Sequence, residues 1–465
     1  MSVPEFDFNI TQLDQGGLRM VRMSHRWFLF GIILLAGCTK TTPVEEISVK
    51  ASGVSLKDAD LSDLSPVWPG WRGPERNGHV PDQPLPTEWN ATKNVKWRTD
   101  IPGRGHSSPV VTEEMVVLAT ADDQEQEQMV VAYNRADGVV RWETVVHAGG
   151  FPGPGELHKK GTNANGTVLY DGEQIYAVFL NSGKIIATAL DLAGKKVWQK
   201  ELGAFNSKFG YAPSPLLYKS FVIIAADNRG GGYLAALDRK TGEIAWRVTR
   251  PAVSTYSSPI VAHVGGRDQL LISGCDKVAS YDPATGKEIW STPCLAEATC
   301  GTIVTSDDKI FASGGYPKRE TVCLSADGKL LWSDNTKIYE PSMLVADGQL
   351  YGITDDGIAY CWSIESGDVL WRNRLRGSFS GSPILCNGLI YVSNLSGETF
   401  VFEANPDSYK EVAFNKLGDD NYASPAVVDG EIFLRVGKQV GDKRQEQLVC
   451  IAAETTENST EKSTE

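Results

Sequence analysis

A glycine followed four positions later by a tryptophan recurs six times along the chain. An apolar alternating run that ends in Asp, Asn or Ser precedes each glycine, and a second short run contains each tryptophan, as in LDRKTGEIAW at 237–246. Alternating runs joined by such turn residues and a glycine predict a β-hairpin with the tryptophan on its outgoing strand. The pairs are Gly138 and Trp142, Gly194 and Trp198, Gly242 and Trp246, Gly286 and Trp290, Gly328 and Trp332, and Gly367 and Trp371.

A second phrase, a small residue with Ser and Pro before an apolar run, precedes each hairpin by about thirty residues. A strand such as FVIIAAD or LIYVSNL lies between the two phrases, so each repeat holds four short strands. Strands at such regular spacing without helical stretches predict an all-β ring. The second phrase reads HSSPVV, APSPLL, YSSPIV, YEPSML, FSGSPIL and YASPAVV from His106, Ala212, Tyr256, Tyr339, Phe379 and Tyr422, with weaker forms NANGTVL and ATCGTIV from Asn163 and Ala298.

The number of units follows from the two ends of the repeat region. The second phrase occurs eight times, and the six tryptophan strands are joined by a degenerate seventh near Val412. The stretch from Gln447 to Ala452 begins a hairpin without reaching a tryptophan strand, whereas Asn94 to Ile101, with Trp97, is a tryptophan strand without a preceding hairpin. Pairing these two stretches completes an eighth unit and removes the exposed sheet edges. The sequence therefore predicts an eight-bladed β-propeller of four-stranded blades, closed by both ends of the chain.

The N-terminal region carries export signals. Residues 1–22 precede Met23, from which the chain reads MSHRWFLFGIILLAGC, a basic start followed by an apolar run too short to span a bilayer. Leu35 to Cys38 resembles a bacterial lipobox, which predicts lipidation of Cys38; the alternative is a buried strand with an ordinary cysteine. Thr39, rather than Asp, favours the outer membrane. We divide the chain into an upstream extension and lipoprotein signal peptide at 1–37, a flexible tether at 38–66, the propeller at 67–453 and a disordered acidic tail at 454–465.

Charge and cysteine content exclude some classes of protein. A formal net charge of −13 argues against nucleic-acid partners, which require clustered Lys and Arg. Besides Cys38 there are seven cysteines, an odd number that cannot all pair within one chain. Cys294 and Cys300 are near enough in sequence for a disulfide, which remains open. No Cys-x-x-Cys and no His-x-x-x-His spacing occurs, so we expect no structural zinc.

The repeat resembles a known family. The pattern Ala236-x-Asp238-x-x-Thr241-Gly242-x-x-x-Trp246 resembles the repeat of quinoprotein-type propellers, whose tryptophan docks against the neighbouring blade. The resemblance runs from about Trp97 to Ala452. It implies either a pyrroloquinoline quinone (PQQ) dehydrogenase or a BamB-like lipoprotein that scaffolds outer-membrane assembly. The opening VWPGWRGPERNGHV, followed by LPTEWN and NVKW, resembles more narrowly the exported PQQ-like propeller proteins of planctomycete-type bacteria.

Two stretches hold the candidate cofactor-binding residues. The stretch HAGGFPGPGELHKKGTNANG at 147–166, here called the insertion, lies in the longest gap between tryptophan strands and is irregular and polar. Such an insertion is either a binding site at one mouth of the central channel or a solvated loop. IPGRGHSSP at 101–109 places two more polar residues just before an inner strand. The candidates are Arg104, His106, Glu156, His158 and Lys160.

For the dehydrogenases, the resemblance implies a platform formed by a disulfide between adjacent cysteines, a calcium-like ion and a carboxylate base. The sequence has no Cys-Cys pair and lacks the long insertions of those enzymes. Four Asp-Asp doublets, at 122–123, 307–308, 355–356 and 419–420, are candidate calcium ligands, but most lie where hairpins turn.

Two functions therefore stand side by side, and we name no catalytic residue and no metal ligand. The favoured hypothesis is a non-catalytic scaffold of the cell envelope, which binds envelope proteins, faces the periplasm and reaches the membrane through a lipid anchor, without nucleic acid. The alternative is a PQQ-dependent oxidoreductase that acts on alcohols or sugars with PQQ and Ca²⁺.

Overall fold

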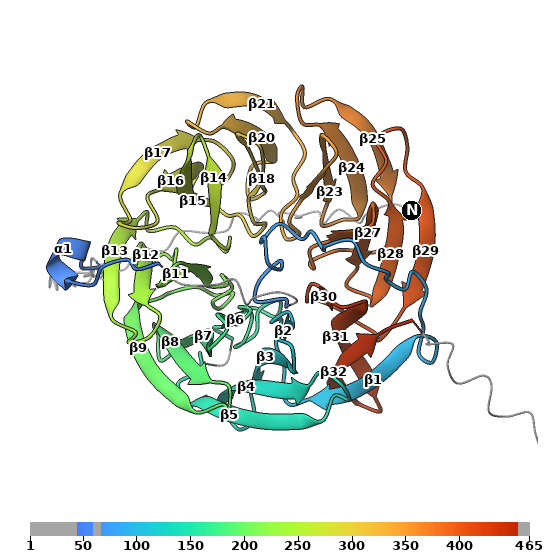
Figure 1. The fold of residues 1–465 in the computed structure, drawn as a ribbon, viewed down its shortest axis with the longest axis horizontal. Helices are drawn as coiled ribbons and strands as arrows, with labels where there is room; N and C mark the ends of the chain where they lie inside the picture. Colours follow the sequence, from blue (N-terminus) through green and yellow to red (C-terminus); the bar gives the residue numbers. More distant parts are fainter. Residues whose placement is uncertain (1–43, 59–66, 154, 454–465) are drawn as a thin grey trace, which may run out of the picture. The chain divides into compact units, whose positions relative to one another are not determined.

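A ring of small β-sheets dominates the computed structural model, which describes residues 44–58, 67–153 and 155–453. In this part of the chain, 32 strands form eight antiparallel sheets of four strands each (Figure 1). The one helix described is α1 (Val49–Ser52), and no described helix is long and apolar enough to cross a membrane. The predicted eight-bladed β-propeller is confirmed.

Each blade contributes one inner, two middle and one outer strand. The inner strands are β2 (Val110–Val111), β6 (Leu169–Tyr170), β10 (Leu216–Tyr218), β14 (Ile260–Val264), β18 (Val304–Ser306), β22 (Leu344–Ala346), β26 (Ile384–Cys386) and β30 (Ala426–Val428). The second strands are β3 (Met115–Asp122), β7 (Gln174–Asn181), β11 (Phe221–Ala225), β15 (Arg267–Ser273), β19 (Lys309–Gly314), β23 (Gln349–Ile353), β27 (Leu389–Ser393) and β31 (Glu431–Val440). The third strands are β4 (Glu127–Asn134), β8 (Lys184–Asp191), β12 (Gly232–Asp238), β16 (Lys277–Tyr281), β20 (Glu320–Ser325), β24 (Ile358–Ser363), β28 (Glu398–Glu403) and β32 (Lys443–Ile451). The outer strands are β5 (Val140–Ala148), β9 (Lys196–Ala204), β13 (Ile244–Arg250), β17 (Glu288–Pro293), β21 (Leu330–Asp334), β25 (Val369–Arg374), β29 (Glu411–Lys416) and β1 (Val95–Ile101).

The last blade is built from both ends of the repeat region. Its sheet has the order β1-β32-β31-β30, so the outer strand comes from the start of the propeller. Trp97 pairs with Cys450 and Asp100 with Gln447 in antiparallel register. The predicted closure of 94–101 against 447–452 is therefore confirmed. We number this blade 8; blades 1 to 7 begin at β2, β6, β10, β14, β18, β22 and β26.

The repeated tryptophan and glycine meet across blade boundaries. At each repeat glycine φ lies between +72° and +83°, and an added Cβ would come within 2.5–2.7 Å of the preceding blade's tryptophan. The glycine is thus required both for the left-handed turn and for the close approach of the indole. Each indole also donates to a main-chain carbonyl of the next blade at 2.7–3.2 Å. The tryptophans are Trp97, Trp142, Trp198, Trp246, Trp290, Trp332 and Trp371, and the acceptors are Arg135, Leu192, Arg239, Pro283, Ala326, Ile364 and Asn405.

The second phrase builds a ring of hydroxyl groups around the channel. In seven cases, the backbone N–H of one phrase donates to the hydroxyl at the same position of the next blade, at 2.8–3.1 Å. Each such bond stabilises the fold by about 1 kcal/mol net and satisfies a buried N–H. The hydroxyls of this ring belong to Ser108, Thr167, Ser214, Ser258, Thr302, Ser342, Ser382 and Ser424.

Residues 67–90, here called the strap, cross one end of the central channel before the chain enters β1. Figure 1 shows this blue segment running over the middle of the ring. Trp68 bridges to Val111 at the end of β2, and His79 bridges in parallel to Leu385 in β26. The strap therefore joins blades 1 and 7, the two blades that flank blade 8.

The strap also reaches into the channel. The Trp71 indole donates to the Thr302 hydroxyl at 2.8 Å, so it contacts the hydroxyl ring itself. Farther along, Trp89 is 3% exposed and belongs to the hydrophobic cluster against which Ala413 packs. Ala413 in β29 pairs with Val401, and Trp371 pairs with Cys361 at the corresponding position of blade 6. Ala413 therefore occupies the position at which blade 7 lacks a tryptophan. The strap supplies the indole that this blade does not encode.

Residues 44–58 lie against the outer edge of blade 3. Ile47 and Arg247 of β13 exchange two backbone hydrogen bonds of 2.8 and 2.9 Å, and the Ser52 hydroxyl donates to the Ala245 carbonyl at 2.7 Å. Trp246 is consequently 0% exposed. These residues fall within the segment predicted to be a flexible tether, and the sequence did not predict this contact.

Several sequence-based expectations fall on other parts of the chain. The predicted signal peptide at 1–37, Cys38 and the acidic tail at 454–465 lie outside the described residues. All seven cysteines in the described part are free thiols, so Cys294 and Cys300 form no disulfide.

Candidate functional site

The two mouths of the channel differ in what covers them. All inner strands run in the same direction, because every blade repeats the same strand order. Residues that precede the inner strands therefore lie toward one mouth, and the turns that follow these strands lie toward the other. The insertion precedes β6 and belongs to the first mouth, which we call the insertion mouth. The strap contacts Val111 at the end of β2 and Leu385 within β26, and it covers the second mouth, the strap mouth.

Lys160 extends across the insertion mouth. Its Nζ lies 2.8 Å from Oε1 of Glu340, a residue that precedes β22. Lys160 precedes blade 2 and Glu340 precedes blade 6, so the pair links opposite sides of an eight-membered ring. The hydrogen bond to Glu340 raises the pKa of Lys160 above its usual value. The insertion is thus fixed over the mouth by a charge pair.

The other two candidates in the insertion point elsewhere. The Glu156 carboxylate accepts from the backbone N–H of Gly153 at 2.7 Å, so it closes a turn of the insertion itself. The His158 ring lies 4.6 Å from that of Phe209, and its backbone N–H donates to the Lys208 carbonyl at 2.6 Å. Both side chains hold the loop in place, and they do not converge with Lys160 on a common point.

His106 and Arg104 lie beside the closure of the ring. The His106 ring stacks on Tyr422, with centroids 4.4 Å apart and planes at 9°. Burial, together with the positive charges of Arg104, Arg435 and Arg444, lowers the pKa of His106 well below its usual value. Among the buried side-chain atoms of the described residues, His106 Nε2 and Arg104 Nε have no hydrogen-bond partner.

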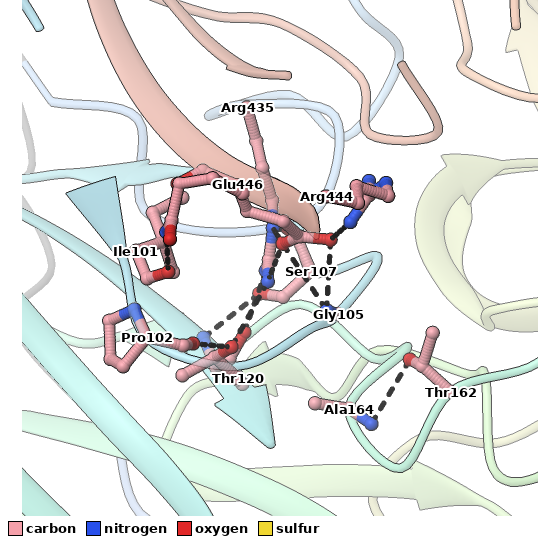
Figure 2. Close-up of polar contacts among 12 residues, drawn as sticks. Ile101, Pro102, Gly105, Ser107, Thr120, Thr162, Ala164, Arg435, Arg444 and Glu446 are labelled. Carbon is pink, nitrogen blue, oxygen red and sulfur yellow. Dashed lines mark hydrogen bonds and ion pairs between the residues drawn. The ribbon is translucent and has the colours of Figure 1, made fainter. Parts of the chain in front are cut away.

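A buried ion-pair network supports these residues. Arg435 Nε lies 2.6 Å from Glu446 Oε2, and the two side chains are 3% and 1% exposed (Figure 2). Arg435 also donates to the Ala119 carbonyl at 2.8 Å and to the Thr120 hydroxyl at 3.2 Å. The Gly105 N–H donates to the Glu446 carboxylate. The network therefore ties blade 8 to blade 1 and positions the backbone next to His106.

Arg444 extends this network toward solvent. Its guanidinium donates to Glu446 at 2.7 Å and makes two bonds of 2.6 Å to Asp420. Asp420, a member of one Asp-Asp doublet, is thereby used as an ion-pair partner. The neighbouring Asn421 is 1% exposed, and its Oδ1 has no hydrogen-bond partner.

The residues at the insertion mouth do not fit PQQ and Ca²⁺. A flat cofactor needs a free aromatic or disulfide face, but the face of His106 is covered by Tyr422. A calcium site needs converging oxygens, yet Glu340 pairs with Lys160, and Asp355 accepts from the Glu340 N–H and lies 3.5 Å from Lys337. Over residues 44–58, 67–153 and 155–453, no group of three or more His, Cys, Asp or Glu side chains is placed to hold a metal ion.

Sequence reasoning missed two residues of this mouth, Glu340 and Tyr422. Both stand two positions before a ring hydroxyl, as do His106 and Tyr256. Aligning the second phrase of all blades on its hydroxyl would have placed these side chains at one mouth. The contact between Lys160 and Glu340 could not be found in this way, because it depends on the conformation of the insertion.

Comparisons with known proteins agree with the fold. The model of the family described as outer membrane protein assembly factor BamB matches residues 80–231, 193–373 and 317–408. A curated protein of that name from Burkholderia pseudomallei (strain K96243) is 30% identical over 112 residues, which cover 23% of this chain and 28% of that protein. Another from Yersinia pestis is 22% identical over 203 residues, 42% of this chain and 45% of that protein. The chain thus spans less than half the length of either relative.

Solved structures show the same architecture. BamB from Moraxella catarrhalis superposes with a TM-score of 0.55 at 15% identity, covering 76% of this chain and 98% of that one. A europium-containing methanol dehydrogenase gives 0.61 at 12% identity, with 84% and 100% covered. The quinohemoprotein alcohol dehydrogenase from Comamonas testosteroni gives 0.62 at 13% identity, with 88% and 82% covered. At such identities the likeness shows the fold alone, and BamB and the dehydrogenases share this fold.

The family is decided by the sequence match. The three matched segments overlap and together run from residue 80 to residue 408, most of the described propeller. The chain therefore belongs to the family described as outer membrane protein assembly factor BamB, whose fold here is a PQQ-like propeller.

Proposed function

We propose that this protein is a non-catalytic scaffold of the cell envelope that binds proteins engaged in outer-membrane protein assembly. The observation that carries the proposal is the family match over residues 80–408. We further propose that Cys38 is lipidated, that residues 38–66 connect this anchor to the propeller at 67–453, and that the propeller faces the periplasm from the outer membrane.

The geometry of the propeller supports a function at its surface. Chain segments cross both mouths of the channel, and the charged groups at the insertion mouth are engaged with one another. Five apolar side chains of the outer strands in blades 5 to 7, in contrast, are 41–51% exposed. Such side chains on neighbouring blades offer area for a protein partner. They are Leu330 and Leu331 in blade 5, Val369 and Leu370 in blade 6, and Val412 in blade 7.

The test combines a deletion strain with partner capture. Deletion of the gene should lower the amounts of outer-membrane β-barrel proteins, and the wild-type gene should restore them. A tagged, cross-linked protein should recover assembly proteins of the outer membrane. The double variant Leu330→Asp, Leu331→Asp should weaken this recovery, whereas Val440→Asp, also at an exposed position (56%), serves as the matched control. Unchanged β-barrel levels together with no assembly protein recovered would overturn the proposal.

The lipid anchor needs a separate experiment. Metabolic labelling with a fatty-acid analogue should label the wild-type protein and not the Cys38→Ala variant, and only the wild type should fractionate with membranes. A Cys38→Ala protein that still carries lipid would reject the anchor.

The second candidate function, a PQQ-dependent oxidoreductase acting on alcohols or sugars, is favoured by one observation. Arg104 Nε and His106 Nε2 are unpartnered near the insertion mouth, and PQQ is an anion that a guanidinium can bind. Titration with PQQ and Ca²⁺, followed by thermal unfolding and dye-linked oxidation, decides between the two functions. A saturable rise in unfolding temperature with turnover, both lost in Arg104→Gln and kept in Arg229→Gln, would establish the enzyme and displace the scaffold.

A further inference from the structure

A buried arginine of the strap lacks a counter-charge. The Arg72 side chain enters the strap mouth, and the residue is 3% exposed. Its Nη2 donates to the carbonyls of Met343, at 2.6 Å, and Asn77. Its Nε and Nη1 are buried and have no hydrogen-bond partner. One nitrogen of the guanidinium is thus hydrogen-bonded, and the other two have no hydrogen-bond acceptor.

No acidic side chain of the described residues forms an ion pair with this guanidinium. Among the ion pairs of the described residues, none includes Arg72 or Arg76, a second strap arginine four positions on. Burial lowers the pKa of Arg72 to about 9 and that of Arg76 to about 10. An unpaired buried cation costs several kcal/mol, which is why such groups are nearly always paired.

The contrast with the other buried arginines is informative. Arg250 binds Asp227 through two bonds of 2.7 and 2.8 Å, and Arg435 binds Glu446. Both are at most 6% exposed, like Arg72. In both cases the fold supplies a carboxylate to the buried guanidinium, and Arg72 differs from them in this respect.

An open groove adjoins Arg72. It has a volume of about 450 Å³ and lies between the strap and the inner strands and turns of blades 5 to 7. Asn77, whose carbonyl binds Arg72, and Val345, two residues after Met343, are among its lining residues. A small ligand that enters this groove at Asn77 would therefore approach the guanidinium from the side of its Nη2.

The charges around the groove are few. His79 lines it, and burial is the largest of the effects that lower the pKa of this imidazole, so it is neutral at pH 7. Asp82 and Asp347 also line the groove but are exposed, where water and salt weaken their repulsion of an anion. The Asp82 carboxylate is in addition occupied by the backbone N–H of Asn387 at 3.2 Å.

We propose that the strap mouth binds a small oxyanion, a carboxylate or phosphate group, at the guanidinium of Arg72, with Arg76 as a second positive charge. The bound anion supplies the missing counter-charge and fastens the strap across the channel. This site lies at the opposite mouth from His106 and Lys160 and is independent of the proposed scaffold function.

The test uses the purified full-length protein with inorganic phosphate or acetate at constant ionic strength in a chloride background. Thermal unfolding should shift upward along a one-site saturation curve for at least one of the two probes, and calorimetry should give the same dissociation constant. A response to phosphate alone or to acetate alone identifies the source of the oxyanion. No saturable response to either probe would overturn the proposal.

Variants locate the site. Arg72→Met, which keeps the side-chain volume, should abolish the saturable shift, and Arg76→Gln should weaken the affinity severalfold. Arg229→Gln, whose side chain is 71% exposed, is the matched control and should bind as the wild type does. If Arg72→Met fails to fold, limited proteolysis of Arg76→Gln provides a second measurement, because phosphate or acetate should protect the strap less than in the wild type. Binding that persists unchanged in both variants would reject the site.

Discussion

Trp89 of the strap stacks on Tyr391 of β27, with ring centroids 6.4 Å apart and planes at 8°. In blade 6, Trp371 packs at 6.1 Å on Tyr351, the residue of β23 that corresponds to Tyr391. An indole from outside the repeat thus takes the place of the tryptophan missing from β29. The strap is therefore part of the core of the ring as well as a cover for its channel.

Trp89→Ala should lower the free energy of unfolding by about 3–5 kcal/mol, the usual cost of removing a buried tryptophan. Placing a tryptophan at the vacant repeat position, as Ala413→Trp in the Trp89→Ala background, should recover part of this loss. Denaturant unfolding measures both effects, and Leu331→Ala, at a position 49% exposed, is the control with little expected change. A Trp89→Ala protein as stable as the wild type would contradict the assigned role.

Gly286→Ala should destabilise the protein more than Gly266→Ala. Their φ angles are +73° and +71°, so both substitutions cost about 1 kcal/mol or more of backbone strain. Only at Gly286 does the new Cβ meet an atom within 4 Å, namely the Trp246 ring at 2.5 Å. The difference between the two variants in thermal unfolding thus measures the clash alone. Equal losses would mean that the indole moves aside without cost.

Glu446→Gln should lower stability by about 3–5 kcal/mol, because it leaves Arg435 as an unpaired buried charge. The double variant Glu446→Gln, Arg435→Met removes that charge and should cost less than the sum of the two single changes. A double-mutant cycle in denaturant gives the coupling energy. A coupling near zero would show that this ion pair does not stabilise the fold.

Stability should fall as the pH decreases from about 7 to about 5, partly because of His106. The pKa of this buried imidazole lies below the usual value of about 6.5, so the unfolded chain takes up a proton that the folded protein refuses. His106→Phe keeps an aromatic ring on Tyr422 and should reduce the dependence of stability on pH in this range. His263→Gln, at a side chain 69% exposed, serves as the control. An unchanged pH profile in His106→Phe would reject this contribution.

The repeats explain why the fold followed from sequence while the site did so only in part. Hairpin turns, strand alternation and the two split ends are local signals, and each recurs in blade after blade. Arg104 and His106 were candidates because they precede an inner strand, and Lys160 because it lies in the polar insertion; the structure places all three near the insertion mouth. Glu156 and His158 were expected to offer ligand groups there, but they bind their own loop and the neighbouring connection. Irregular loops leave no periodic signal, so the direction of such side chains cannot be deduced from spacing.

The sequence by itself determined the number of blades, the position of the ring closure and the seven repeat tryptophans that lock one blade to the next, because a fixed period imposes the same local geometry at every repeat. The tertiary structure alone decided which distant residues meet. The contacts of Trp89 with Tyr391, Lys160 with Glu340, and residues 44–58 with β13 join segments about 180 to 300 residues apart. Such contacts depend on which segments the closed ring brings together in space, and a local pattern of amino acids does not show which distant residues will be neighbours.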